Sequence, residues 1–164
     1  MKKDIFQATY EKYYRPLYLY ALSLCKSPAD ADDLVQNTFL KALLSYEEGG
    51  SIRYWLTKVL QNEYYNLCRQ RKRLLPEGET WLEQQAGLAP DLLERLIHEE
   101  QKRYLFQCIL ELSDTQKAVM LGSVYFDLSD EELAGQLRTT RENVRQLRCR
   151  ARKQLGKRME ERYG

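Results

Sequence analysis

The chain has 164 residues, enough for one ordinary domain or two small ones. Hydrophobic residues make up 43% of it and charged residues 30%, which excludes a disordered chain and indicates a globular one. No apolar run approaches the roughly 20 residues that a membrane span needs, and the first residues lack the apolar core of an export signal. We therefore expect a cytoplasmic protein without membrane insertion.

The cysteines and the histidine argue against metal and disulfide chemistry. Cys25, Cys68, Cys108 and Cys149 are widely spaced without a Cys-x-x-Cys pair, and His98 is the only histidine. A zinc site needs ligands at close spacing, and a disulfide framework belongs to small secreted domains. We expect four reduced cysteines in a cytosolic protein with no metal site and no cofactor.

Charge is strongly segregated along the chain although the net charge is only +2. Residues 66–73 carry four bases and no acid, and residues 138–164 carry ten bases against three acids. Acidic segments separate them, among them residues 74–100 with seven acids and one arginine. Two separate basic segments predict two contacts with a polyanion such as nucleic acid.

The first half has the apolar spacing of three helices. A first helical face is formed by Tyr10, Tyr13, Leu17, Ala21 and Leu24. A second helix should start at residues 27–30, where Ser is the N-cap and Pro the first helical residue, and run to about residue 44. Its inward side chains are Leu34, Val35, Thr38 and Ala42. A break at residues 48–51 precedes a third helix, 51–73, whose apolar part is Trp55, Leu56, Val59 and Leu60.

The fold class predicted from these patterns is all-α, with two small helical domains, residues 1–73 and 91–164. The acidic segment 74–90 contains two prolines and two glycines and is the predicted linker. In the second domain we expect a helix over 91–112 and another from Ser113 or Asp114 that carries Val119, Met120 and Val124. Capping boxes at Ser129 and Thr139 should start two more.

Residues 129–155 have the spacing of a helix-turn-helix. Leu133, Ala134 and Leu137 would pack a short first helix against Val144 and Leu147 of a longer second one. An ordinary helical hairpin would explain the spacing but not the charge, because a helix in the major groove needs cations for phosphates. The second helix supplies five of them: Arg141, Arg145, Arg148, Arg150 and Arg152.

The expected roles differ along this second helix. At about 100° per residue, four arginines form one stripe beside the apolar stripe: Arg141, Arg145, Arg148 and Arg152. Side chains near the N-terminus of a recognition helix reach bases, which predicts base contacts for Arg141, Glu142, Arg145 and Gln146. Arg148 and Arg152 lie farther along and should neutralise phosphates.

These segments resemble a known family. "SDEELAGQLRTTRENVRQLRCRARKQL" (residues 129–155) is similar to the promoter-binding C-terminal domain of the sigma-70 family, extracytoplasmic function (ECF) group. "ADDLVQNTFLKAL" (31–43) resembles that group's helix that binds core RNA polymerase, and "WLTKVLQNEYYNLCRQRKR" (55–73) resembles its helix that binds the minus-ten element. The segments follow one another in the family's order and span nearly the whole chain.

The resemblance implies roles by position. The polymerase-binding residues would be Asp32, Asp33, Gln36 and Phe39. The minus-ten contacts would be Trp55, Asn62, Arg69, Arg71 and Arg73, where an aromatic ring can stack on a melted base and arginines hold the backbone. The helix-turn-helix would bind the minus-thirty-five element, and an anti-sigma protein is implied as a further partner.

Three positions depart from the family's pattern. Arg138 stands in the turn of the helix-turn-helix, where the family usually has Gly, so this turn is expected to differ. Asn66 replaces a usual Asp, and the segment from Tyr46 to Ser51 is short. Asn66 makes the surface of its helix more cationic. The family reads a flipped minus-ten base in the short segment, so this last departure bears on minus-ten specificity rather than on the fold.

We therefore expect a transcription initiation factor that binds core polymerase and directs it to particular promoters. It should not be an enzyme, because the sequence has no catalytic triad and no Gly-rich phosphate loop. A stand-alone helix-turn-helix regulator would explain residues 129–155 but not the N-terminal motifs. A helical adaptor that binds only proteins would leave both basic segments unexplained.

Overall fold

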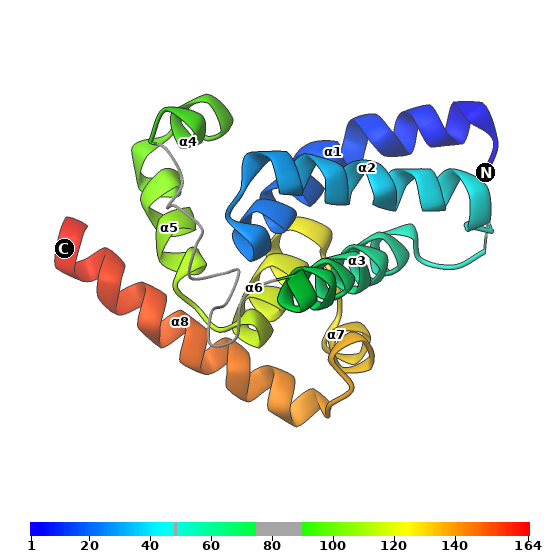
Figure 1. The fold of residues 1–164 in the computed structure, drawn as a ribbon. Helices are drawn as coiled ribbons and strands as arrows, with labels where there is room; N and C mark the ends of the chain where they lie inside the picture. The colour runs from blue at the N-terminus through cyan, green and yellow to red at the C-terminus, as the bar shows by residue number, and fades with distance from the viewer. Residues whose placement is uncertain (48, 75–89) are drawn as a thin grey trace. The chain divides into compact units, whose positions relative to one another are not determined.

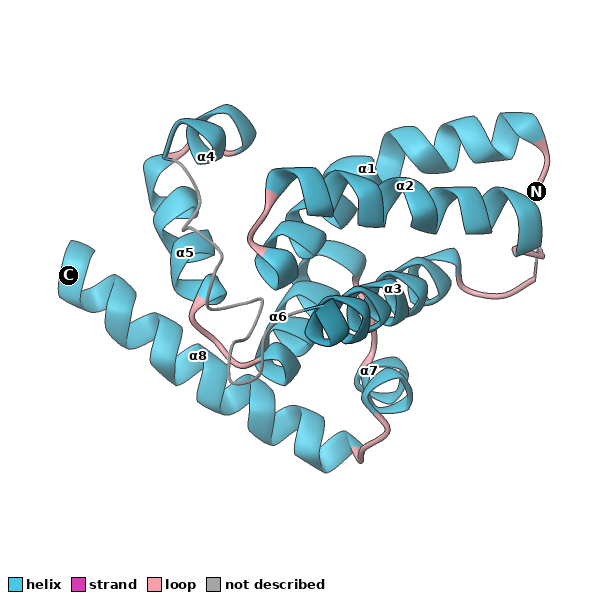
Figure 2. Cartoon of the chain, in the orientation of Figure 1, coloured by secondary structure: helices cyan, strands magenta, loops and turns pink. Residues whose placement is uncertain are grey.

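The structure is a computed structural model that describes residues 1–47, 49–74 and 90–164. Those residues form helices joined by short turns and contain no strand, in agreement with the predicted all-α class (Figure 2). The chain divides into two compact units, Met1–Gly87 and Leu88–Gly164. The helices are α1 (Lys3–Cys25), α2 (Pro28–Ser45), α3 (Ile52–Leu74), α4 (Pro90–Leu96), α5 (Glu100–Leu110), α6 (Asp114–Phe126), α7 (Asp130–Leu137) and α8 (Arg141–Tyr163) (Figure 1).

The first unit is built from α1, α2 and α3, which all pack against one another. The predicted start of α2 is confirmed: Pro28 is its first residue, and the Ser27 hydroxyl accepts a hydrogen bond from the Asp30 amide at 3.4 Å. Leu56 and Leu60 of α3 are completely buried. The fully buried aromatic side chains of this core are Tyr20, Phe39 and Tyr64.

In the second unit α8 packs against α5, α6 and α7, and α6 also contacts α7. Both predicted serine caps are present: Ser113 and Ser129 each form a capping box, with Gln116 and Glu132 respectively. Val119 and Met120 are buried, whereas Val124 is 69% exposed, contrary to its expected place in the apolar part of α6. Helices α6 and α7 therefore start where their serine caps indicate, but not every apolar residue belongs to the core.

Two predicted boundaries were wrong. The helix expected over 91–112 is two helices, since α4 ends at Leu96 and α5 begins at Glu100. Arg103 stabilises the break, because its Nη1 donates to the carbonyl oxygens of Ile97 at 2.9 Å and His98 at 2.7 Å. The last helix is capped by Thr140 rather than Thr139: its hydroxyl accepts from the Asn143 amide at 3.1 Å.

The turn between α7 and α8 keeps a left-handed residue although that residue is not glycine. Arg138 has φ 54° and ψ 49° and is the C-cap of α7. A non-glycine residue pays about 1 kcal/mol for this conformation, so the turn has the backbone that glycine favours at a modest cost. The expectation of a different turn is therefore not met.

The predicted linker, 74–90, lies almost wholly outside the described residues; of its ends, Leu74 belongs to α3 and Pro90 to α4. Among the helices described, none is long and apolar enough to cross a membrane.

Candidate nucleic-acid and protein interfaces

The cationic surface of the second unit lies along α8. Arg145, Arg148, Cys149, Arg152 and Lys153 line an open hollow of about 450 Å³ on this helix. The neighbouring stripe of the helix is apolar and holds α8 in the unit, with Val144, Ala151 and Leu155 buried. The structure thus places a row of cations on a helix whose apolar stripe is fixed, as a groove-binding helix requires.

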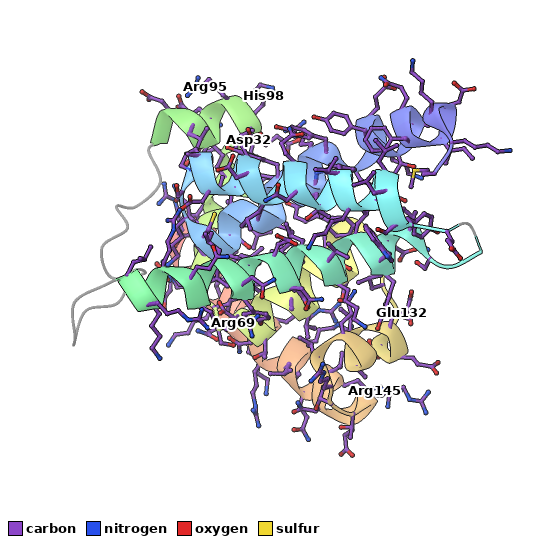
Figure 3. All side chains as sticks on the ribbon, turned by 45° about the vertical axis from the view of Figure 1, so that its right-hand side comes forward. Asp32, Arg69, Arg95, His98, Glu132 and Arg145 are labelled. Carbon is purple, nitrogen blue, oxygen red and sulfur yellow. The ribbon has the colours of Figure 1, made fainter. Side chains whose placement is uncertain are left out.

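The four side chains predicted to reach bases are all exposed: Arg141, Glu142, Arg145 and Gln146. Arg145 projects from α8 near the first helix of the helix-turn-helix (Figure 3). Arg152, expected to contact a phosphate, is exposed as well. Each can meet DNA without a change in the fold.

Arg148 is placed differently from its neighbours in the stripe. Its side chain is only 17% exposed, and Nη2 donates to Asp130 Oδ1 at 2.5 Å and to Ser123 Oγ at 3.1 Å. These bonds connect α8 with the first residue of α7 and with α6. The Arg148 hydrogen bond lowers the pKa of Asp130 below its ordinary value. The expected phosphate contact of Arg148 is thus replaced in this structure by contacts inside the unit.

In the first unit, the basic end of α3 contains both exposed and engaged arginines. Arg69 and Arg73 are exposed, and Figure 3 shows Arg69 projecting from α3. Arg69 donates to the side chain of Asn66, the residue that stands for the family's usual Asp. Arg71 instead forms a two-point pair with Asp30 at the start of α2. Of the three predicted arginine contacts, Arg69 and Arg73 are thus available to a nucleic-acid backbone, whereas Arg71 is held inside the unit.

The start of α3 presents an aromatic pair beside the short loop. The ring centroids of Trp55 and Tyr46 lie 5.7 Å apart, edge to face. The Tyr46 hydroxyl donates to the Gly50 carbonyl at 2.6 Å and so joins the two ends of this turn. Trp55 is half-buried and Asn62 is exposed, so this ring and this amide add to the arginines that α3 presents.

The predicted polymerase-binding face of α2 is exposed at three of its four residues. Asp32, Asp33 and Gln36 lie on the surface, and Figure 3 shows Asp32 on α2. Phe39 is only 1% exposed, because α1 covers its ring: Tyr10 and Phe6 lie 4.7 and 6.3 Å from it between centroids. Phe39 therefore supports this face from below and has no surface of its own to offer a partner.

Tyrosines of α1, which the sequence motifs did not indicate, hold the polar side chains of this face. The Tyr14 hydroxyl donates to Asp32 Oδ1 at 3.1 Å, and the Tyr10 hydroxyl accepts from Gln36 Nε2 at 3.3 Å. Burial, followed by the hydrogen bond to Asp32, raises the pKa of Tyr14 to about 12. The i, i+4 spacing of the two tyrosines was visible in the sequence, but their partners lie on another helix.

The same helix α2 also has exposed leucines that sequence reasoning did not select. Leu40 and Leu44 are 53% and 74% exposed, one turn apart and beyond Gln36. At four-residue spacing they continue the exposed face of Asp32 and Gln36 along α2, and this part of the face is apolar. Their exposure could not be foreseen, because the helical period of α2 is satisfied by inward Leu34, Val35 and Ala42 alone.

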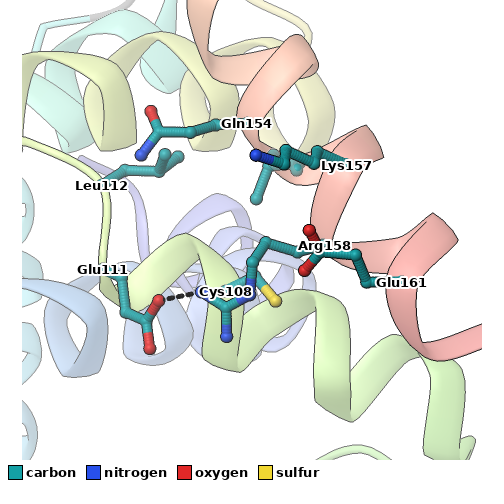
Figure 4. A pocket seen from close by; sticks show the side chains of 8 residues that line it. Cys108, Glu111, Leu112, Gln154, Lys157, Arg158 and Glu161 are labelled. Atoms are coloured by element: carbon teal, nitrogen blue, oxygen red, sulfur yellow. Dashed lines mark hydrogen bonds and ion pairs between the residues drawn. The ribbon is translucent and has the colours of Figure 1, made fainter.

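A pocket of about 290 Å³ lies between α5 and α8, away from the cationic stripe (Figure 4). Cys108 and Leu112 line it from one side, and Gln154 and Arg158 from the other. Arg158 pairs with Glu111 across it. No group of potential metal ligands is found among residues 1–47, 49–74 and 90–164. We therefore interpret the pocket as a gap in the packing of two helices that a salt bridge joins, and not as a ligand site.

The fold and the cationic second helix of the helix-turn-helix define a helical DNA-binding protein with a separate N-terminal unit. Two family models match the chain, sigma-70 region 2 over residues 9–74 and sigma-70 region 4 over residues 102–155. The chain is 27% identical to the RNA polymerase sigma factor YlaC of Bacillus subtilis, over 96% of the chain and 93% of that protein. It is 26% identical to the ECF RNA polymerase sigma factor SigX of the same organism, with 96% and 85% covered.

Two solved structures share the fold. The sigma factor RpoE of Bartonella quintana, in complex with the anti-sigma factor NepR, gives a TM-score of 0.68 at 24% identity and covers 97% of the chain and 98% of its own. CnrH, in complex with the cytosolic domain of CnrY, gives 0.67 at 18% identity, with 98% and 91% covered. The two family models, taken with the curated sigma factors that match along the chain, show that it belongs to the sigma-70 family, and within it to the ECF group.

Proposed function

We propose that this chain is a dissociable sigma subunit that contacts core RNA polymerase through α2 and promoter DNA through α3 and α8. The observation that carries the proposal is the presence of sigma-70 regions 2 and 4 in one chain and in that order. Each region has an exposed set of side chains suited to its role. Asp32, Asp33 and Gln36 would meet polymerase, and the arginine-bearing ends of α3 and α8 would meet DNA.

The residue roles follow from exposure and charge. Trp55 and Asn62, together with Arg69 and Arg73, would contact the minus-ten element, because rings stack on unpaired bases and guanidinium groups bind backbone phosphates. Arg141, Glu142, Arg145 and Gln146 would read the minus-thirty-five element, and Arg152 would bind phosphate. Arg71 and Arg148 would act indirectly, by fixing helices.

A stand-alone regulator is the alternative, and region 2 counts against it. A regulator that binds duplex DNA alone needs no polymerase-binding α2 and no separate cationic α3. A regulatory subunit has no reaction of its own to catalyse, so we place this protein among transcription factors of the cytoplasm and not among enzymes. The anti-sigma partners named in the two related complexes support a similar inhibitor for this chain.

The decisive experiment is transcription of genomic DNA by purified core polymerase with and without the protein, followed by sequencing of transcript ends. The proposal expects new start sites that share two spaced sequence elements and that vanish without the protein. The protein alone should bind such promoters weakly, because each DNA surface is small and both need the polymerase as a scaffold. Tight, specific binding by the protein alone, with no new start sites, would support the regulator instead.

An anti-sigma partner can be sought separately. The tagged protein, recovered from its own cells under a range of growth conditions, should bring down polymerase in some conditions and a smaller inhibitor in others. Recovery of polymerase in all conditions, with no second partner, would contradict this part of the proposal.

A further inference from the structure

The first helix of the helix-turn-helix carries a carboxylate that touches two arginines of the second helix. Asp130 is the first residue of α7, directly after the cap Ser129. Its Oδ1 accepts from Arg148 Nη2 at 2.5 Å, and its Oδ2 lies 3.5 Å from Arg145 Nε. One carboxylate therefore connects a half-buried arginine with an exposed one on the adjacent turn of α8.

The two arginines are held to different extents. Arg148 is 17% exposed and also bonds Ser123, so Asp130 is itself held by a side chain with a second contact inside the unit. The Arg145 side chain is 67% exposed and meets Asp130 through Nε, the nitrogen nearest its stem. The two terminal nitrogens lie farther along this exposed side chain and are the part of the guanidinium that can meet a ligand.

We propose that Asp130 is a specificity-determining residue that orients Arg145 for two-point recognition of a guanine in the minus-thirty-five element. The inference rests on the proposed function and adds the base that α8 would recognise. A guanine presents two acceptors, N7 and O6, in the major groove, and two parallel guanidinium N–H groups match them. Since Nε is the nitrogen of Arg145 closest to Asp130, the Nη1 and Nη2 groups are left as the pair that can meet these two acceptors.

The advantage of this arrangement lies in order, not in stability. An exposed ion pair contributes little to folding because water screens it and the long side chain loses freedom. Because the Arg145 side chain loses this conformational freedom before DNA binds, less conformational entropy is lost on binding. A free arginine can move to the nearest phosphate and become insensitive to sequence, whereas an arginine held at Nε keeps its terminal pair near the base edges.

The test uses holoenzyme, assembled from core polymerase and the full chain, on a promoter identified by the transcript-end experiment. Dissociation constants are measured for all single-base variants of its upstream element, at one salt concentration. The variants of the protein are Arg145→Ala, Asp130→Asn and both together. Glu131→Gln is the matched control, because it removes the same charge from the next residue of α7, which is exposed and has no ion pair in the described structure. Melting temperatures are recorded for each.

Arg145→Ala is expected to reduce discrimination at one G·C pair by roughly five- to 100-fold. Asp130→Asn should reduce discrimination at the same pair by roughly two- to tenfold, the cost of ordering one long side chain on binding. The double variant should equal Arg145→Ala, and Glu131→Gln should leave discrimination unchanged. Replacing that guanine by 7-deazaguanine should abolish the difference between the wild type and Asp130→Asn, because N7 is then missing.

Three results would overturn the inference. If Asp130→Asn and Glu131→Gln strengthen binding to all variants alike, Asp130 acts only as a negative charge near phosphates. If Asp130→Asn weakens all variants alike and lowers the melting temperature, it acts only through Arg148. If Arg145→Ala leaves every base preference unchanged, Arg145 does not read a base. A wild-type protein that directs polymerase to no start site would instead contradict the proposed function itself.

Discussion

Arg71 near the C-terminus of α3 and Asp30 near the N-terminus of α2 form a two-point ion pair. Nη1 lies 2.8 Å from Oδ2 and Nη2 lies 2.6 Å from Oδ1, and Asp30 is 8% exposed. The pair joins residues 41 positions apart in the sequence. It connects the helix that would bind polymerase with the end of the helix that would bind DNA, so it sets where Arg69 and Arg73 are presented.

Asp30→Ala should therefore destabilise the first unit. Removing one partner leaves a mostly buried guanidinium without its acceptor, and because Arg71 retains some solvent access we expect a loss of about 1–3 kcal/mol. Urea unfolding monitored by circular dichroism measures this loss. Asp33→Ala, in the same turn region of α2 but exposed, is the control and should change stability by less than about 0.5 kcal/mol. Equal effects of the two substitutions would show that the pair adds nothing beyond helix-dipole charge.

The sequence predicted the parts of the fold that depend on local chemistry. Three helices start after Ser27, Ser113 and Ser129, because the serine oxygen accepts a hydrogen bond from a free amide three residues on. This local pattern can be recognised in the sequence. The arginine stripe of α8 followed from helical period alone. The family resemblance then supplied the roles of the exposed residues of α2 and α3.

The sequence could not predict which charged residues pair within the fold. Arg71 and Arg148 look like their exposed neighbours in a helical projection, but each meets an acid 41 or 18 positions away. Phe39 was read as a contact residue, yet rings of α1 cover it. The break between α4 and α5 depends on Arg103 binding two carbonyl oxygens, which no apolar period reveals.

Charge reversal on α2 should weaken assembly with core polymerase. Asp33→Lys replaces an exposed acid on the proposed docking face, and we expect an increase in Kd of roughly tenfold, about 1.4 kcal/mol. Stability should not change, because the side chain is exposed and has no ion pair in the described structure. Binding of labelled protein to immobilised core polymerase measures the effect. Asp4→Lys, an exposed acid in the first turn of α1, should leave Kd unchanged; an equal loss in both variants would indicate general electrostatics.

Two glycines offer a matched test of helix packing. A Cβ on Gly122 would lie 2.7 Å from Leu133 Cδ2, where α6 and α7 approach closely, whereas a Cβ on Gly156 of α8 would meet nothing within 4 Å. Gly122→Ala should cost about 1–3 kcal/mol by overpacking a buried leucine. Gly156→Ala should stabilise by about 0.5–1 kcal/mol, because alanine favours the helix. Thermal unfolding of both variants measures these changes in stability. An unchanged stability of Gly122→Ala would mean that Leu133 can move aside.

The cysteines should differ in their reaction with thiol reagents. Cys149 is exposed, whereas Cys25 is completely buried, and burial raises the pKa of Cys25 to about 11. At pH 8, mass spectrometry of the briefly labelled native protein should find Cys149 modified and Cys25 intact. Unfolding in urea should expose Cys25 to the reagent. Rapid labelling of Cys25 without urea would show that the end of α1 opens readily.

The raised pKa of Cys25 also predicts the sign of a pH effect. The unfolded thiol ionises near pH 9 and the folded one near pH 11, so between these values the folded state binds more protons. This contribution to stability is present below pH 9 and is lost as the pH rises toward 11. Cys25→Ala should show a smaller decline in unfolding free energy than the wild type over that interval. Parallel declines would show that the thiol stays protonated or that other groups dominate.

Arg152 and Arg148 lie on the same stripe of α8 but have different surroundings, for which we propose different roles. Arg152 is exposed, beyond the base-reading turn, so Arg152→Ala should weaken holoenzyme binding to every upstream sequence about equally. The slope of log K against log salt should fall by about one, since one phosphate contact releases about one counterion. Arg148 is committed to Asp130 and Ser123. Arg148→Ala should therefore lower the unfolding free energy of the second unit by about 1–3 kcal/mol.

The measurement is binding to a labelled promoter at four or more salt concentrations, with unfolding recorded separately for each variant. Lys153→Ala is a useful third variant, because its side chain lines the same hollow on the helix and carries the same charge as Arg152. A reduced salt slope for Arg148→Ala, with stability unchanged, would show that Arg148 leaves Asp130 when DNA binds. In that case the carboxylate would be an exchangeable partner that DNA displaces, and the fixed geometry of the helix-turn-helix would have to come from buried apolar side chains such as Leu133 and Val144.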